Sequence, residues 1–180
     1  MQTNKKIIVI NGNGGVGKDT LVNGLENHDI KVLNISSITP ILDIFERSKE
    51  TLRNCGINVN DIKKDEKLRK LFSQMKEAYD EYTSLSMNYL FQTTCDFLKS
   101  DFEVMFVHIR EPENIAKFKT VVKDNLELDI KTILVVRDTK TVWHNSSDDN
   151  VSNYDYDVVF DNNADKDVKI TEFAELIRSL

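Results

Sequence analysis

Residues 7–20 read IIVINGNGGVGKDT, an apolar run that turns into a glycine-rich stretch and then into helix-forming sequence. A polyphosphate is bound by several main-chain N–H groups at once, so a loop that binds one needs small residues with free φ angles. The stretch supplies Gly12, Gly14, Gly15 and Gly17. A helix that starts near Gly17 would direct the positive end of its dipole at the same anion. The pattern predicts a strand, a phosphate-binding loop and a helix in succession.

The residues that follow the last glycine define the chemistry of this loop. Lys18 is placed to reach the terminal phosphates of a nucleoside triphosphate. The spacing is that of the Walker A motif, GxxxxGK, but Asp19 stands where the motif has Ser or Thr to bind magnesium. A carboxylate is still a hard oxygen ligand for Mg²⁺, and Thr20 offers a hydroxyl one position later. Two other interpretations stay open: Asp19 as a first-turn acid that stabilises the helix, and the loop as a turn without a ligand.

Length and composition limit the class of protein. With 180 residues the chain is expected to be one domain, 1–180. Its net charge is −6 and it has no stripe of basic residues, so polymeric nucleic acid is not an expected partner. Cys55 and Cys95 form no CxxC pair and lie among helix-type residues, so buried thiols in a reducing compartment are expected. The sequence has no apolar run of membrane length, and the residues after Lys5 and Lys6 do not resemble a signal peptide. We therefore expect a cytoplasmic protein with no membrane partner.

Strand-like and helix-like segments alternate along the chain, which is typical of a parallel sheet covered by helices on both faces. Beyond the first strand, strands are expected at 31–36, 104–109, 130–136 and 156–160. Helices are expected from Pro40 toward Asn54, from about Asp65, around 87–98, from Pro112 and from about Thr171. The helix after Asp65 carries an apolar stripe of Leu68, Leu71, Phe72 and Met75 at helical spacing.

Polar residues follow the strands at the edge where an α/β sheet binds its ligands, beyond the carboxyl ends. They are Ser36 and Ser37, Arg110 and Glu111, Arg137 and Asp138, and Asp161, Asn162 and Asn163. Two arginines at this edge suit phosphoryl transfer, which needs guanidinium groups to neutralise the transferred oxygens. Each arginine could instead pair with its acidic neighbour.

The strand that precedes Arg110 ends without an aspartate of the Walker B kind. Glu111 is then the nearest candidate to hold a cation through water. Capping of the helix that begins at Pro112 is an equally consistent role for Glu111.

The segment of about 40–100 is longer than a crossover helix requires, and we expect it to hold the acceptor. It carries a basic cluster of Lys63, Lys64, Lys67, Arg69 and Lys70. Because acidic residues are interspersed among these basic ones, we expect most of the cluster to be an ordinary solvated helix face. Arg69 is the one residue of the cluster that we expect to contact the acceptor. Phe72, Tyr79 and Tyr82 could stack on a base, although the core is the preferred interpretation for them.

Between the last two strands, residues 137–154 are polar and of the length of a mobile lid. Arg137, Lys140 and His144 are the cations of this segment. A lone histidine in such a loop is usually solvated, so His144 is assigned no catalytic role.

Five stretches together resemble a known family: GNGGVGKDT, NISSI, KDEKLRKLFS, FVHIREPENI and NYDYDVVFDNNAD. They are similar to the bacterial and phage P-loop kinases grouped with the deoxynucleoside monophosphate kinases, with phosphomevalonate and dephospho-coenzyme A kinases as more distant relatives. The similarity spans nearly the whole chain. Its most specific piece is the GKD variant of the loop, which deoxynucleotide and phosphomevalonate kinases of this type share.

The resemblance implies a three-layer P-loop NTPase fold with a five-stranded parallel sheet, like that of nucleoside monophosphate kinases. It also implies ATP and Mg²⁺ as donor and transfer of the γ-phosphoryl group to a small phosphorylated acceptor. The donor phosphates would be bound by Gly12, Asn13, Gly14, Gly15, Val16, Gly17, Lys18, Asp19 and Thr20. Asp161, Asn162 and Asn163 would lie beside the adenine, Arg110 would meet the acceptor phosphate, and Arg137 would be the first residue of the lid. Apart from the resemblance, Ser37 and Arg69 are also expected to bind the acceptor.

Three functions remain open at this stage. The first is the small-molecule kinase, acting on a nucleoside or deoxynucleoside monophosphate or on another phosphorylated metabolite. The second is a P-loop switch or ATPase that signals through a partner, although the sequence has no guanine-reading NKxD. The third is a nucleotide-binding protein without turnover, which the scarcity of arginine in the lid favours. Neither the acceptor's identity nor the oligomeric state follows from the sequence.

Overall fold

The computed structural model describes residues 5–56, 66–138 and 151–180. By the contacts between its residues, the chain divides into two units. The first consists of Met1–Ile35 and Thr93–Leu180, and the second of Ser36–Gln92. Each unit is described by itself below.

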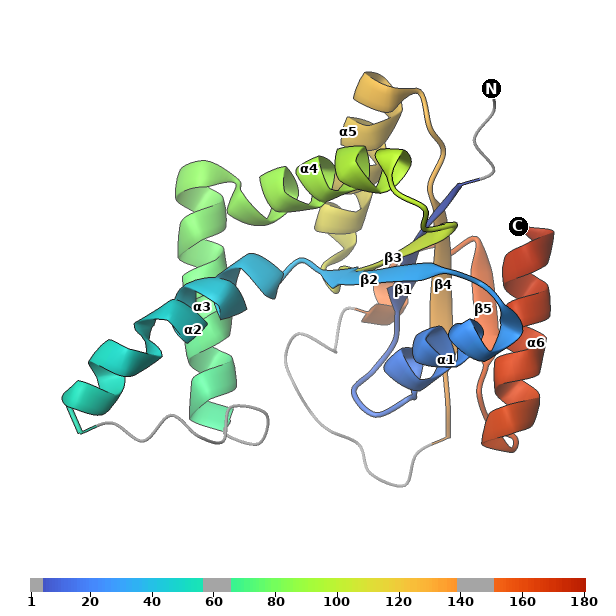
Figure 1. The fold of residues 1–180 in the computed structure, drawn as a ribbon, viewed down its shortest axis with the longest axis horizontal. Helices are drawn as coiled ribbons and strands as arrows, with labels where there is room; N and C mark the ends of the chain where they lie inside the picture. Colours follow the sequence, from blue (N-terminus) through green and yellow to red (C-terminus); the bar gives the residue numbers. More distant parts are fainter. Residues whose placement is uncertain (1–4, 57–65, 139–150) are drawn as a thin grey trace. The chain divides into compact units, whose positions relative to one another are not determined.

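The first unit is built on a five-stranded parallel sheet with the strand order β2-β3-β1-β4-β5 (Figure 1). The strands are β1 (Lys6–Asn11), β2 (Val32–Ser36), β3 (Val104–His108), β4 (Lys131–Val136) and β5 (Val158–Asp161). In the register of the central strand, Ile8 is opposite Phe106 on one side and Lys131 on the other. The predicted α/β fold class and its five-stranded parallel sheet are confirmed.

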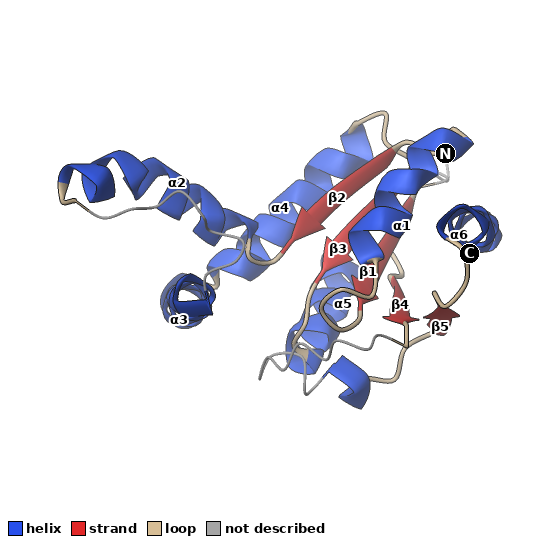
Figure 2. Cartoon of the chain, turned by 90° about the horizontal axis from the view of Figure 1, so that it is seen from below, coloured by secondary structure: helices blue, strands red, loops and turns tan. Residues whose placement is uncertain are grey.

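Helices cover both faces of this sheet, with α1 and α6 on one side and α5 on the other (Figure 2). The helical elements of the first unit are α1 (Lys18–Gly24), η1 (Leu25–His28), the end of α4 (Leu85–Lys99), α5 (Pro112–Leu126), η2 (Val151–Asn153) and α6 (Lys166–Ser179). The last helix begins earlier than the predicted Thr171. The reason is a cap: the side chain of Asp165 accepts a hydrogen bond from the Asp167 N–H.

The core of the first unit follows from the alternation of side chains along the strands. Ile8 and Ile10 of β1 pack with residues of α1 and α6, including Leu21 and Phe173, and all four are fully buried. Ile7 and Val9 point to the opposite face, which α5 covers with its buried residues Ile115, Phe118 and Val122. Both faces are therefore apolar, and the polar residues collect at the strand ends.

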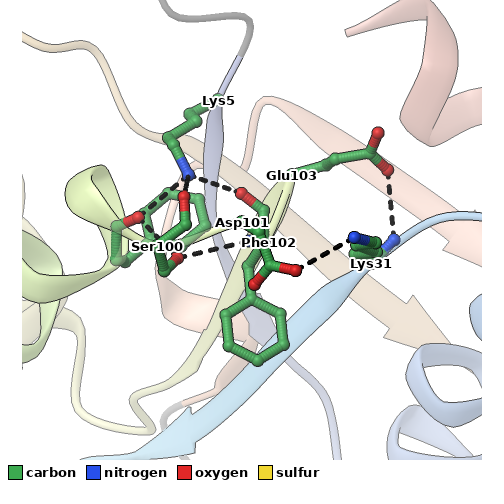
Figure 3. A network of polar contacts seen from close by, with 7 residues as sticks. Lys5, Lys31, Ser100, Asp101, Phe102 and Glu103 are labelled. Atoms are coloured by element: carbon green, nitrogen blue, oxygen red, sulfur yellow. Dashed lines mark hydrogen bonds and ion pairs between the residues drawn. The ribbon is translucent and has the colours of Figure 1, made fainter.

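Two consecutive lysines anchor helices at the amino-terminal edge of the sheet. Lys5 donates from Nζ to the carbonyls of Phe97, Ser100 and Phe102, at 3.0, 2.8 and 2.6 Å, and so satisfies the end of α4 (Figure 3). Lys6 donates to the carbonyls of Ile177 and Arg178 at the end of α6, at 2.7 and 2.9 Å. A cation at a helix carboxyl end also interacts favourably with the helix dipole.

The second unit consists of α2 (Thr39–Asn54), α3 (Glu66–Thr83) and the first part of α4. Its small core joins Ile41, Phe45 and Phe72, and the rings of Phe45 and Phe72 meet edge to face at 4.9 Å. The helix predicted from Pro40 toward Asn54 is confirmed, with the proline in its first turn. The predicted cap at Asp65 and the cluster lysines Lys63 and Lys64 lie outside the described residues.

Several burial predictions are wrong in this part of the chain. In α3, Phe72 is buried and Leu68 and Met75 pack against the core, but Leu71 is 41% exposed because it lies outside the arc of the helix that meets α2. Tyr79 is 39% exposed and Tyr82 is 89% exposed, so Tyr82 is not a core residue.

The expectation of buried thiols is also corrected. Cys55 is exposed, because it forms the carboxyl-terminal cap of α2, and Cys95 is half-buried. Among the helices that the structure describes, none combines the length and the apolar character needed to cross a bilayer.

Candidate functional site

The glycine-rich loop joins β1 to α1 in a conformation that needs glycine. Gly12, Gly15 and Gly17 have φ angles of 144°, 83° and 93°. At Gly12, a Cβ would run into the main-chain carbonyl oxygen of Val135 in β4. Gly12 is therefore required by its φ angle and by the close approach of the loop to β4.

The main-chain N–H groups of this loop are the part that can bind an anion. Gly12 donates its N–H to Asn11 Oδ1 at 2.9 Å, and Val16 donates to the Asn13 carbonyl at 3.5 Å. Within the part of the chain that the structure describes, the N–H groups of Gly14, Gly15 and Gly17 make no hydrogen bond. Gly14 and Gly17 are half-buried and Gly15 is exposed, and unused N–H donors at such positions suit a ligand with several acceptor oxygens, such as a polyphosphate.

Lys18 is the first residue of α1, and its ammonium group lies on the loop. Its Nζ donates to the main-chain carbonyls of Gly12 and Asn13. These contacts keep the charge beside the glycine N–H groups, within reach of a phosphate bound there. The next side chain, Asp19, is 81% exposed, and Thr20 is exposed as well. Both keep their oxygen atoms accessible to a hydrated cation.

Asn162 and Asn163 brace the loop and the chain that leaves β4. Asn162 is buried, and its Nδ2 donates to the Val16 carbonyl at 2.7 Å while its own N–H donates to the Val136 carbonyl at 2.8 Å. Asn163 Oδ1 accepts from the N–H of Asp138 at 2.7 Å. Their expected position beside the adenine stays a prediction, and the structure adds a second role for both side chains.

Arg110 and Arg137 follow β3 and β4 and are both exposed. The main-chain carbonyl of Arg110 accepts a hydrogen bond of 3.2 Å from Asn11 Nδ2, which places the arginine next to the start of the loop. Arg137 has no ion pair within the described residues, so its expected alternative, a pair with Asp138, is not observed.

Glu111 occupies the amino-terminal cap position of α5 with an extended backbone, but its side chain makes no capping hydrogen bond. Its Oε2 accepts from Asn114 Nδ2 at 3.4 Å. Of the two roles considered for Glu111, the structure shows the cap position of its main chain, and the cation contact stays a prediction.

His108 is a site residue that the sequence did not indicate, and its only signal was its place as the last residue of the apolar strand VMFVH. Its Nε2 lies 2.8 Å from Asn34 Oδ1 and 3.8 Å from Asp19 Oδ1. Burial lowers the pKa of His108 to about 4, more than the nearby Asp19 raises it, and the charges of Lys18 and Arg110 lower it further. The imidazole is therefore neutral at pH 7, with the proton on Nε2 assigned from the acceptor character of Asn34 Oδ1.

Ser37 and Arg69, the expected acceptor contacts, belong to the second unit. Ser37 is buried just before α2, and Arg69 lies on the exposed face of α3. The site geometry above comes from the first unit alone, so their part in acceptor binding stays a prediction.

The residues present fit a magnesium ion that is held mainly by phosphates and water. No group of three or more histidine, cysteine or acidic side chains in the described ranges could hold a metal by itself. Mg²⁺ usually keeps several waters and takes only one or two carboxylates when it is bound with a nucleotide. Asp19 supplies an exposed carboxylate beside the loop, and Glu111 is the second candidate.

Comparisons with known proteins identify the fold. No protein-family model and no curated protein sequence matches the chain. Among solved structures, a "putative kinase" from Chloroflexus aurantiacus has a TM-score of 0.54 at 12% identity over 99% of both chains. TT1252 from Thermus thermophilus has a TM-score of 0.52 at 15% identity over 98% of both chains. The tunicamycin resistance protein of Deinococcus radiodurans has a TM-score of 0.51 at 13% identity, over 96% of this chain and 95% of that one.

These likenesses extend over almost the whole chain, and at such identities they establish the fold alone. The chain has the three-layer α/β fold of the P-loop kinases. The three-layer fold that the family resemblance implied is therefore confirmed.

Proposed function

We propose that the protein is a phosphotransferase that moves the γ-phosphoryl group of ATP, with Mg²⁺, to a small phosphorylated acceptor. A nucleoside or deoxynucleoside monophosphate is the acceptor that the motifs favour. The observation that carries the proposal is the loop itself: Gly14, Gly15 and Gly17 present N–H groups that have no hydrogen-bond partner among the described residues, and the ammonium of Lys18 lies beside them.

In this proposal, each charged residue of the site acts on a different part of the reaction. The loop N–H groups bind the donor phosphates, and Lys18 moves from the carbonyls of Gly12 and Asn13 to the phosphate oxygens. Arg110 binds the acceptor phosphate, and Arg137 neutralises charge on the transferred group. Bound Mg²⁺, near Asp19, would neutralise charge on the donor phosphates.

A phosphorylated acceptor suits this set of residues. The second pKa of a phosphate monoester is about 6, so its oxygen is already ionised at neutral pH. Such a nucleophile needs no general base, unlike a sugar hydroxyl. A neutral His108 that donates its Nε2 proton to Asn34 is consistent with a site that performs no proton transfer at this position.

The alternative is a nucleotide-binding protein without turnover. It is favoured by one observation, the composition of segment 137–154, in which Arg137 is the single arginine. Lys140 could replace a second arginine only weakly, because a lysine lacks the planar fork of hydrogen-bond donors that binds a phosphate.

An ADP-release assay with a panel of acceptors tests the proposal. The panel contains ribonucleoside and deoxyribonucleoside monophosphates, other phosphorylated metabolites, and unphosphorylated sugars as the control class. Turnover that depends on a phosphorylated acceptor supports the proposal. ADP release without an acceptor indicates an ATPase, and ATP binding by calorimetry without ADP release indicates the alternative.

A further inference from the structure

Asn11 is a buried polar residue for which the proposed chemistry has no direct use. It is the last residue of β1 and is 1% exposed. Its Oδ1 accepts from the Gly12 N–H at 2.9 Å, and its Nδ2 donates to the Arg110 carbonyl at 3.2 Å and to the Tyr156 hydroxyl at 2.8 Å. The acceptor and both donors of the amide are thus engaged, and the N–H of Gly12 and the carbonyl of Arg110 determine which way round the amide lies.

These contacts join three segments that are far apart in the sequence. Gly12 opens the phosphate loop, Arg110 follows β3, and Tyr156 precedes β5. The Tyr156 hydroxyl in turn donates to the Val151 carbonyl at 2.9 Å. Because β1 lies beside β3 in the sheet, a side chain at its carboxyl end can reach the residue that follows β3, and the same amide also reaches Tyr156 in the segment before β5.

We propose that Asn11 is a positioning residue that sets the distance between the phosphate loop and Arg110, and that Tyr156 extends this link to Val151. The inference rests on the proposed function, in which the loop holds the donor and Arg110 meets the acceptor. In-line transfer is sensitive to displacements of about 1 Å, so a side chain that touches neither substrate can still control the rate.

The variant Asn11→Asp separates the contact with Gly12 from the contact with Arg110. It keeps an oxygen that accepts from the Gly12 N–H, and it replaces the amide that donates to the Arg110 carbonyl by an oxygen that repels this carbonyl. We expect kcat to fall and the KM for the acceptor to rise, each about tenfold, while the calorimetric Kd for ATP without acceptor changes by less than about threefold. Tyr156→Phe removes one partner of the amide and should shift the same parameters in the same direction by less.

A double-mutant cycle with Arg110→Ala tests whether Asn11 acts through Arg110. If it does, Asn11→Asp should raise the acceptor KM little further once the guanidinium is gone. Additive effects would overturn the inference. The matched control is Ser100→Ala, which removes a half-buried hydroxyl that donates to the Phe97 carbonyl at 2.7 Å in the turn before β3, and it should leave kcat and both KM values unchanged.

Hydrogen exchange gives a readout that does not need turnover. In Asn11→Asp, or in Tyr156→Phe should the first variant not fold, peptides that cover 7–20 and 108–115 should both exchange faster than in the parent protein. Faster exchange confined to 7–20 would overturn the inference. If the parent protein shows no acceptor-dependent turnover, the proposed function fails, while the exchange result still decides whether the link exists.

Discussion

Asn162 donates a hydrogen bond of 2.7 Å from its side-chain amide to the main-chain carbonyl of Val16, across 146 residues of sequence. The same nitrogen occupies the space that a side chain at Gly17 would need, since a Cβ there would lie 2.7 Å from it. The phosphate loop is therefore shaped by the segment after β5 as well as by its own glycines.

The first prediction follows from this contact. Gly17→Ala should weaken ATP binding about tenfold or more, because the methyl group displaces Asn162 and because alanine resists a φ of 93°. Calorimetry in the presence of magnesium measures this Kd. Gly56→Ala is the control: Gly56 has a φ of 75° with nothing within 4 Å, so its variant should lose only about 1–2 kcal/mol of stability. Equal ATP affinity in the parent protein and Gly17→Ala would contradict the account of the loop.

Lys18→Ala should lower kcat/KM for ATP by about a hundredfold or more, because each 1.36 kcal/mol of lost transition-state stabilisation is about tenfold in rate. Steady-state kinetics with the acceptor found in the panel provides the measurement. Lys117→Ala, on the exposed face of α5, is the matched loss of one positive charge and should leave the rate unchanged. A Lys18 variant with the parent rate would refute the role given to this residue.

Arg110→Ala should raise the KM for the acceptor by more than the KM for ATP, because its guanidinium is assigned to the acceptor phosphate. The two KM values are compared in one series of initial-rate measurements. If both rise by the same factor, Arg110 does not belong to the acceptor side of the site.

The free energy of unfolding should decrease as the pH is lowered, because His108 is buried in its neutral form. Its pKa is lowered from the model-peptide value of 6.5 to about 4 in the folded protein, so the unfolded chain binds more protons between these values. The stabilisation is present above pH 6.5 and is lost as the pH falls toward 4, on the order of 3 kcal/mol in total.

Guanidinium unfolding from pH 8 to pH 4 measures this loss, with His108→Gln as the comparison. The variant should show a shallower decline than the parent protein below pH 6.5. His28→Gln, which changes a histidine outside the site, should decline as the parent does. Parallel curves for all three proteins would show that His108 is not buried in its neutral form.

Lys5→Met should lower the free energy of unfolding by about 1.5–3 kcal/mol, because the Phe97 carbonyl in α4 and the carbonyls of Ser100 and Phe102 in the turn after it lose a charged donor (Figure 3). Lys31→Met is the matched control. Lys31 pairs with Asp101 at 2.9 Å, but both side chains are mostly exposed, and such pairs contribute little. Denaturant titration of the two variants should therefore separate them clearly, and a Lys5 variant as stable as the parent would contradict the anchoring role.

The strands, the loop and most helices could be predicted from the sequence because each depends on a local pattern. Four glycines ahead of Lys18 indicate a phosphate loop wherever the chain goes next, and alternation between apolar strands and amphipathic helices indicates a parallel sheet. The error at Leu71 shows the limit of this reasoning. Periodicity identifies the apolar stripe of α3 but not how wide an arc of it meets α2, so a residue at the edge of the stripe can stay exposed.

The sequence by itself determined the fold class and the glycine-rich loop after β1, since those depend on neighbours along the chain. Only the tertiary structure decided which side chains hold that loop in place. Asn11, His108 and Asn162 receive their roles from partners in other segments of the chain, at distances in sequence that no local pattern encodes. The order of the strands brings these partners together, because parallel strands end at one edge and a polar side chain buried there must find its hydrogen bonds among them.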